Sequence, residues 1–191
     1  MKSVVLAFLL AAVPATAMAA DTAAGPVKDH SFTDADGHRV LRETIVVKAS
    51  LDSVWKAYTT DAGFMRWAAP VAHITPGNNG MMESALEDGG KIGDPGNVLN
   101  RIDVYLPDSL IVFHNEHVPA GGPMDPATFA SLRSMLAFEP AGDGFTRVTQ
   151  TVIGFGESAK YDDLYRHLRD GNAAYLAAMA KSVPPEKTAQ Q

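Results

Sequence analysis

The residues of this chain best suited to chemistry lie together in the segment His114-Asn115-Glu116-His117. Imidazole and carboxylate groups can ligate metals and can carry protons near neutral pH. The surrounding pattern predicts a β-strand over residues 110–118, and successive side chains of a strand point to opposite faces. His114 and His117 therefore point to opposite faces and cannot both ligate one ion without a β-bulge between them. We expect no metal site here.

His114 and Glu116, in contrast, share one face of that strand with Leu110 and Val112. If this face lines the interior, a histidine and a carboxylate project into an apolar cavity, where burial and proximity shift both pKa values. If the end of the strand emerges into solvent, the pair is an ordinary exposed polar end. The first arrangement makes His114 and Glu116 candidate ligand-binding residues.

Two amides extend the candidate set. Gln150 lies between Val148 and Val152 on one face of a predicted strand, and Asn100 lies between Val98 and Ile102 in the same way. A buried amide needs hydrogen-bond partners, which neighbouring side chains, water or the polar groups of a ligand can supply. Asn100 and Gln150 are candidates for orienting a ligand, with purely structural bonding as the alternative.

Other catalytic and cofactor motifs receive little support. Residues 154–159 match the pattern G-x-G-x-x-A between a strand and a helix, which is the local setting of a dinucleotide fingerprint. No strand follows that helix to complete a βαβ unit, so we expect no cofactor and assign these glycines to a sharp turn. The chain has no cysteine and no G-x-S-x-G elbow, which removes thiol catalysis and one common serine arrangement.

A long helix over residues 158–182 must help to position these groups. Its larger apolar residues recur in steps of three, four or seven and form one stripe that requires burial: Tyr161, Leu164, Leu168, Tyr175 and Met179. The stripe is interrupted at Gly171-Asn172. This interruption leaves space for a ligand, bends the helix or permits close contact with a strand.

The rest of the chain predicts one strand over 40–48, two short helices over 51–58 and 60–67, and then several strands joined by turns. The later strands are expected at 71–75, 80–86, 98–106, 110–118, 129–139 and 145–155. Hairpin-connected strands followed by a helix indicate an α+β fold, with a curved antiparallel sheet wrapped around the C-terminal helix. We expect a single domain over 38–183, a flexible lead over 20–37 and a disordered tail over 184–191.

The first 19 residues are typical of a signal peptide, because Lys2 precedes an apolar run and Ala17-Met18-Ala19 fits a cleavage site. The run is too short to span a bilayer. We therefore expect an exported protein, periplasmic or secreted, without a membrane anchor. The net charge is −6 and no basic cluster is visible, so a nucleic-acid partner is not expected.

Short motifs over residues 40–180 are similar to those of one superfamily. The motifs are Ala49-Ser50, Val54-Trp55, Ala57, Thr60-Asp61, the stretch from Phe64 to Trp67, Phe138-Glu139-Pro140, Arg147-Val148-Thr149, Gly154-Phe155 and Leu176. On these residues the sequence resembles the helix-grip superfamily of START lipid-transfer and birch-pollen-allergen proteins, also called SRPBCC. Within it, the chain is most similar to the branch shared with activators of heat-shock-protein ATPases.

The resemblance implies a cavity between the sheet and the C-terminal helix that binds a small hydrophobic or amphipathic molecule. Phe64 and Trp67 are expected at its entrance. The chain has Trp67-Ala68 where many members have a tryptophan pair, and polar residues at 114–116 where they have aromatic ones. These departures indicate a more polar pocket. A cyclase- or hydrolase-like enzyme using His114 and Glu116, or an envelope protein-interaction module with a protein partner, are the alternatives.

Overall fold

The computed structural model describes residues 25–119 and 125–184. The expected signal peptide and nearly all of the expected tail lie outside these ranges. The helices are α1 (Leu51–Thr59), α2 (Asp61–Phe64), α3 (Pro126–Ala130) and α4 (Ala159–Ser182). The strands are β1 (Lys28–Asp29), β2 (Phe32–Thr33), β3 (Arg39–Val47), β4 (Val71–Thr75), β5 (Met81–Ala85), β6 (Val98–Leu106), β7 (Leu110–His117), β8 (Arg133–Pro140) and β9 (Thr146–Ile153). None of these helices is long and apolar enough to cross a membrane.

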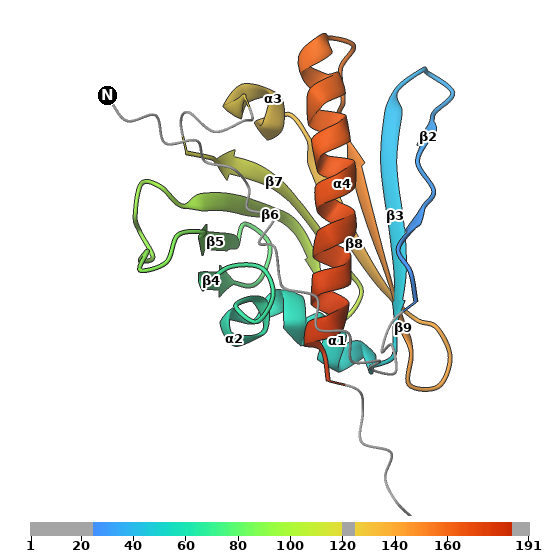
Figure 1. Ribbon diagram of the computed structural model, residues 1–191, viewed down its shortest axis with the longest axis vertical. Helices are drawn as coiled ribbons and strands as arrows, with labels where there is room; N and C mark the ends of the chain where they lie inside the picture. Colours follow the sequence, from blue (N-terminus) through green and yellow to red (C-terminus); the bar gives the residue numbers. More distant parts are fainter. Residues whose placement is uncertain (1–24, 120–124, 185–191) are drawn as a thin grey trace, which may run out of the picture.

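The strands form one antiparallel sheet in the order β1-β3-β9-β8-β7-β6-β5-β4, and β2 pairs with β3 beside β1. Figure 1 shows the sheet curving around α4, which packs along β3 with α1 and α2 near one end and α3 near the other. The predicted α+β architecture, with a curved sheet around a long C-terminal helix, is confirmed.

Burial alternates along β3, which identifies the two faces of the sheet. Leu41, Ile45 and Val47 are at most 2% exposed, whereas Arg42 between them is exposed. The buried side chains pack against α4, and we call their side of the sheet the inner face. The side that Arg42 shares is the outer face. Because strand side chains alternate, each position of a strand belongs to one of these faces.

The core divides into two apolar clusters along α4. The large cluster joins inner-face residues of the sheet to α1 and to the C-terminal half of α4, including Leu176 and Met179, which are fully buried. The small cluster joins Leu41 and Val152 to Leu164 near the start of α4. A single helix therefore covers both clusters, and the sheet positions between them are those where site residues are found.

One predicted strand is wrong at its start. The expected strand over 129–139 is in fact α3 followed by β8, so Phe129 is helical. The Asp125 carboxylate accepts a hydrogen bond from the backbone N–H of Thr128 at 3.0 Å, and Pro126 occupies the first turn. An aspartate followed by a proline is a helix-start signal, because the side chain caps a free N–H and proline lacks one.

The sharp turn expected before α4 is present. Gly154 has φ +98°, a conformation that favours glycine, and a Cβ there would lie 2.8 Å from the backbone oxygen of Ser131. At the other end of the chain, residues expected in the flexible lead form β1 and β2 on the edge of β3. The described part of the lead thus extends the sheet.

Candidate functional site

Glu43 is the most unusual residue of the inner face. It lies between Leu41 and Ile45 on β3 and is 2% exposed, and its Oε2 has no hydrogen-bond partner within residues 25–119 and 125–184. Burial raises the pKa of this carboxyl to about 7, with Asp29 adding to the effect and Arg169 opposing it. Burying a carboxylate without a partner is unfavourable, so such a group is a candidate for binding a ligand.

The sheet supplies two further polar groups beside Glu43. Gln150 of β9 is its cross-strand partner, and such neighbours have Cβ atoms about 5 Å apart. Ser134 of β8 pairs with Val152 and therefore also belongs to the inner face. Gln150 and Ser134 are only partly buried, so solvent reaches the inner face here. Within the described ranges, neither side chain has a hydrogen-bond partner.

The opposite wall comes from the middle of α4. Leu168 packs on the small cluster beside Leu41, and Leu176 belongs to the large cluster that contains Ile45. Asn172 lies one helical turn from each leucine, so it occupies the stretch of α4 between the two clusters, as Glu43 does on β3. The Asn172 Nδ2 is buried and likewise lacks a partner in the described part of the chain.

The glycine beside Asn172 leaves room. A Cβ built on Gly171 meets no heavy atom within 4 Å, so close contact with a strand does not explain this residue. Of the three alternatives for the interrupted stripe, open space agrees with this geometry. We call Glu43, Ser134, Gln150 and Asn172 the inner polar site.

Local electrostatics favour a positive or hydrogen-donating guest at the inner polar site. Asp29 and Asp170 are near enough to raise the pKa of Glu43, and Arg169 is near enough to lower it. Arg169 is itself paired with Asp170, at 3.0 Å from Nε to Oδ1. The arginine charge is therefore largely taken up by its neighbour. A ligand amine or hydroxyl could donate to the free Glu43 oxygen, and the Asn172 amide could donate in turn to a ligand acceptor.

An aromatic wall adjoins the site on the side of the large cluster. Ring contacts at 4.8 to 5.7 Å between centroids link its seven members: Trp55, Tyr58, Phe64, Trp67, Tyr105, Phe138 and Tyr175. The Trp67 indole N–H donates to the Ala57 backbone oxygen at 2.9 Å. Phe64 and Trp67 thus lie on this wall, and their role at a ligand entrance stays a prediction.

Both predicted amides lie on the inner face, at different places. Gln150 belongs to the inner polar site, whereas Asn100 lies on β6 beside the buried Ile102. The Asn100 Oδ1 accepts a hydrogen bond at 3.3 Å from Asn115, a buried residue of β7. Asn115 also donates to the backbone oxygens of Leu99 and His117, so it ties the ends of these strands together.

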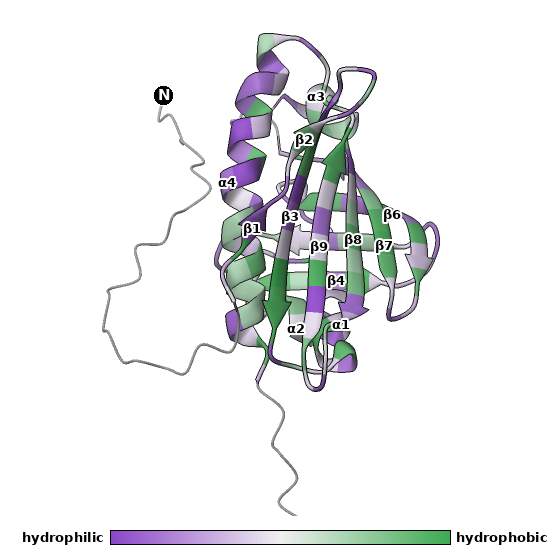
Figure 2. Cartoon of the chain, turned by 90° about the vertical axis from the view of Figure 1, so that its right-hand side faces the viewer, coloured by the Kyte–Doolittle hydropathy of each residue, from purple (hydrophilic) through white to green (hydrophobic). Residues whose placement is uncertain are grey.

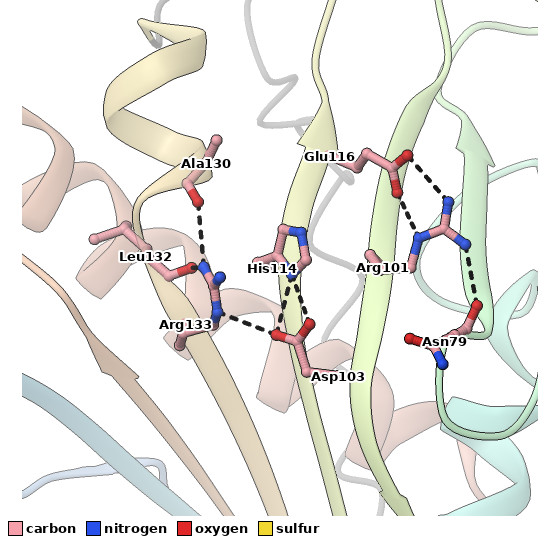
Figure 3. Close-up of polar contacts among 8 residues, drawn as sticks. All are labelled: Asn79, Arg101, Asp103, His114, Glu116, Ala130, Leu132 and Arg133. Carbon is pink, nitrogen blue, oxygen red and sulfur yellow. Dashed lines mark hydrogen bonds and ion pairs between the residues drawn. The ribbon is translucent and has the colours of Figure 1, made fainter.

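His114 and Glu116 do not project into the interior. Ile111 is 1% exposed and Phe113 packs on the large cluster, so these two define the inner side of β7. His114 and Glu116 have the opposite parity and lie on the outer face (Figure 3). The expectation that their face lines a cavity is wrong, because Leu110 and Val112 are apolar residues of the outer face.

On the outer face, these residues belong to two ion-pair groups (Figure 3). The His114 Nδ1 lies 2.9 and 3.0 Å from the Asp103 carboxylate oxygens, and the Arg133 Nε lies 3.1 Å from the same carboxylate. Glu116 accepts two hydrogen bonds from Arg101, at 2.6 and 3.0 Å, and these bonds lower the pKa of Glu116.

The carboxylates of both groups come from irregular points in the β6–β7 ladder. Arg101 pairs with His114 and Ile102 with Phe113, but Asp103 and Glu116 are each left without a partner position where the register shifts. Each is the extra residue of a β-bulge, and a bulge changes the direction of a side chain. Asp103 is thereby paired with His114 and Arg133, and Glu116 with Arg101, so the two carboxylates link neighbouring strands on the outer face.

A separate group of possible metal ligands lies on the turn between β2 and β3. Asp34, Asp36 and His38 bring three ligand atoms within 4.8 Å of one another, and all three residues are exposed. The Asp34 carboxylate accepts the backbone N–H groups of Asp36 and His38 at 3.0 and 2.8 Å. These bonds account for the cluster as a turn.

No family model and no curated protein matches the chain. Solved structures do. CalU16 from Micromonospora echinospora is 18% identical and has a TM-score of 0.59, over 84% of this chain and 88% of CalU16. The Aha1 dimer from Colwellia psychrerythraea is 18% identical with a TM-score of 0.56, over 75% of this chain and 95% of that one. This chain has the helix-grip fold.

An AHSA1-like protein from Aeromonas hydrophila shares this helix-grip fold with a TM-score of 0.53 at 14% identity, over 74% of this chain and 91% of that one. The similarity to Aha1-like structures agrees with the resemblance found in the sequence. At these identities the likeness describes the fold alone.

Glu43 and Asn172 were not among the predicted ligand-binding residues. A signal for Glu43 is present in the sequence, because it shares its parity on the first long strand with Leu41, Ile45 and Val47. A charged residue within an apolar stripe marks a buried charge. Asn172 is part of the interruption of the helix stripe, but only the fold shows that it lies between the two clusters, as Glu43 does on β3.

Proposed function

We propose that this helix-grip protein binds a small amphipathic molecule between the inner face of the sheet and α4. The polar end of the ligand would lie at the inner polar site, and its apolar part would pack toward the aromatic wall. The observation that carries the proposal is the buried Glu43 carboxylate with an unpartnered oxygen. A ligand donor would restore the hydrogen bond that the folded chain leaves unmade.

The chemistry of the site narrows the ligand class. Glu43 accepts hydrogen bonds when ionised, and the nearby acidic groups disfavour a second anion. An ammonium or hydroxyl group suits this position, whereas a ligand carboxylate does not. The most exposed large apolar side chains are spread over separate elements, from Phe32 on β2 to Ile153 on β9. That dispersal favours a small molecule over a protein partner.

Export is part of the proposal. It is supported by the sequence pattern of residues 1–19, a positive residue, an apolar run and an A-x-A cleavage site. N-terminal sequencing of the protein recovered from a secreting host is expected to find a mature chain that begins at Ala20. Recovery of unprocessed chain in the cytoplasm would contradict export without affecting the binding proposal.

Native mass spectrometry of the mature protein, purified without detergent, is the first test of binding. We expect a stoichiometric adduct that is lost on denaturation, and an organic extract of the same sample identifies it. A reproducible apo mass would contradict tight carriage and leave only transient binding.

The ligand class is tested with octylamine, octanol and octanoate, which share one tail and differ in the head group. Quenching of Trp55 and Trp67 fluorescence is expected to give saturable binding of octylamine and octanol, and much weaker binding of octanoate. Glu43→Gln is expected to weaken octylamine binding by about tenfold or more, because it removes a charge-assisted hydrogen bond. Glu139→Gln, which removes an exposed carboxylate of the outer face, is the matched control. Equal binding of all three probes would show that Glu43 has no part in recognition.

A second candidate function is acid–base catalysis at the same site. A carboxyl with a pKa of about 7 can release and take up a proton near neutral pH. Once a ligand is identified, its conversion by the wild-type protein and its unchanged recovery from Glu43→Gln would support an enzyme. His114, on the outer face, is not expected to affect that turnover.

A further inference from the structure

A hollow lies on the outer face, on the opposite side of the sheet from the inner polar site. It consists of two adjoining cavities of about 460 and 330 Å³ that share His30, Thr44 and Arg147. Figure 2 looks onto this part of the sheet, with β1 and β2 lying against β3 and with β9 and β8 beyond it. We call it the outer groove.

Strand register explains why the sheet is hollowed here. The central row of outer-face positions carries short side chains on the longer strands, because Thr44 pairs with Thr149 and Thr149 pairs with Ala137. On one side of this row Arg42 projects from β3, and on the other side Arg147 projects from β9. The two arginines are four residues apart along the strands, or about 13 Å. Both side chains are long enough to reach a molecule held between them.

The floor of the groove offers a hydroxyl donor. The Thr44 and Thr149 Oγ1 atoms lie 3.3 Å apart, so one hydroxyl donates to the other. The accepting threonine keeps its own O–H free to point at a guest. Thr149 is only 7% exposed, so its side chain lies in the floor of the groove and does not project from the surface.

The lining is positively charged although the chain as a whole is acidic. Lys28, Arg42 and Arg147 are cationic and Glu139 is the single acidic lining residue, an excess of two positive charges in a chain of net charge −6. Glu139 approaches Arg147 only to 4.0 Å. Within the described residues, the Arg42 guanidinium and the Lys28 ammonium have no ion-pair partner.

The remaining wall is apolar. Pro26 and Val46 line one end of the groove, and Phe32 at the other end is 48% exposed. Arg42 is held in place through its backbone, since its N–H donates to the Ser31 hydroxyl at 3.1 Å and its carbonyl oxygen accepts from the His30 N–H at 2.7 Å. The N-terminal strands thus close the groove with an apolar rim beside a cationic centre.

We propose that the outer groove is a second binding site, which takes a small molecule with an oxyanion head, a phosphate monoester or a carboxylate, and a compact apolar substituent. Arg42 and Arg147 bind the oxyanion from two sides, and the threonine pair donates from below. Guanidinium groups match the oxygens of both head groups, and a bound anion supplies the counter-charge that the lining lacks. The apolar substituent lies toward Pro26, Val46 or Phe32.

The test is an NMR titration of the full mature chain, labelled with ¹⁵N, at constant ionic strength. The probes are phenyl phosphate, benzoate and the neutral analogue benzyl alcohol. We expect saturable shifts of the Thr44 and Thr149 amides with one or both anions, and none with benzyl alcohol. The two anionic probes distinguish a phosphate site from a carboxylate site. Shifts that grow linearly without saturation, or equal binding of benzyl alcohol, would overturn the proposal.

Arginine variants separate a specific site from a general charge effect. Arg42→Ala and Arg147→Ala are each expected to weaken binding of the anion by about tenfold. Arg166→Ala removes the same charge from the exposed face of α4, where Arg166 pairs with Asp163, and should change the affinity by less than twofold. An equal loss of anion affinity in all three variants would show that binding depends only on net charge and would overturn the proposal. Octylamine binding at the inner polar site is expected to be unchanged in Arg42→Ala, so the two binding proposals are tested independently.

Discussion

At the scale of single residues, Glu43 links stability to pH. The folded chain raises its pKa from the ordinary 4.5 to about 7. Between these two values the folded state keeps a proton that the unfolded state has released. The free energy of unfolding therefore falls as the pH rises from about 4.5 to 7, and the loss is complete above that range.

Glu43→Gln should remove this dependence, because glutamine has a similar shape and does not titrate. At pH 8 we expect the variant to be more stable than the wild type by about 3 kcal/mol, and at pH 4 the two should nearly coincide. Urea unfolding at a series of pH values measures the difference. Other titrating groups act equally in both proteins and cancel. A constant difference across the series would show that Glu43 is not the titrating group.

The residue scale is also where the sequence was least informative. The sequence of a strand shows which residues share a face, but which of the two faces is buried depends on contacts from other elements. On β7 both faces carry apolar residues, so the pattern did not decide between Ile111 and Val112. On β3 it did, because Leu41, Ile45 and Val47 form one clear stripe, and Glu43 was detectable within it.

At the scale of elements, Gly171 lowers the stability of α4 and leaves room beside Asn172 that a larger residue would fill. Glycine in a helix interior is less favourable than alanine by about 1 kcal/mol, and a Cβ at this position meets no atom within 4 Å. Gly171→Ala is therefore expected to stabilise the protein by about 0.5 to 1 kcal/mol. It should also weaken octylamine binding, since the added methyl group narrows the space beside Asn172.

Thermal unfolding and the fluorescence titration measure these two effects on the same variant. Gly63→Ala is the contrasting control. A Cβ there would lie 2.0 Å from the backbone oxygen of Lys56, so the same substitution is expected to destabilise the protein. A Gly171→Ala protein that is stabilised and binds octylamine as well as the wild type would place the ligand away from α4.

Most elements followed from local signals, and the exceptions have local causes. Residues 71–75 and 98–106 were predicted as strands with the bounds that the structure has, because turn residues flank both. The helix α3 was not predicted because its five residues are too few to show a periodicity, although Asp125 and Pro126 are a helix-start signal. The pairing of residues 28–33 with β3 is a tertiary contact, and no local pattern predicts it.

At the scale of the whole molecule, the antiparallel sheet around a C-terminal helix was predictable because hairpin-joined strands before a long amphipathic helix permit few arrangements. The inner polar site was not. It arises where β3, β9 and the middle of α4 meet, between two apolar clusters. Residues distant in the sequence define it, so only the assembled fold brings Glu43 and Asn172 together.

This division of the core predicts that α4 opens in two stages. Its C-terminal half lies on the large cluster, where Leu176 and Met179 are fully buried, and its N-terminal half lies on the small one. Local opening free energies follow the apolar burial of each part. In hydrogen exchange, amides of residues 163–170 should therefore exchange faster than those of 176–182, and octylamine should slow the faster group, because the ligand bridges the middle of the helix to the sheet.

Two leucine variants test this coupling. Leu164→Ala acts on the small cluster and is expected to speed exchange in the N-terminal half of α4 while leaving residues 176–182 protected. Leu176→Ala creates a cavity in the large cluster, which costs about 2 to 5 kcal/mol, and should speed exchange through most of the sheet. If Leu164→Ala exposed both halves of α4 equally, the helix would open as one unit. A ligand at Glu43 could then not stabilise one half more than the other.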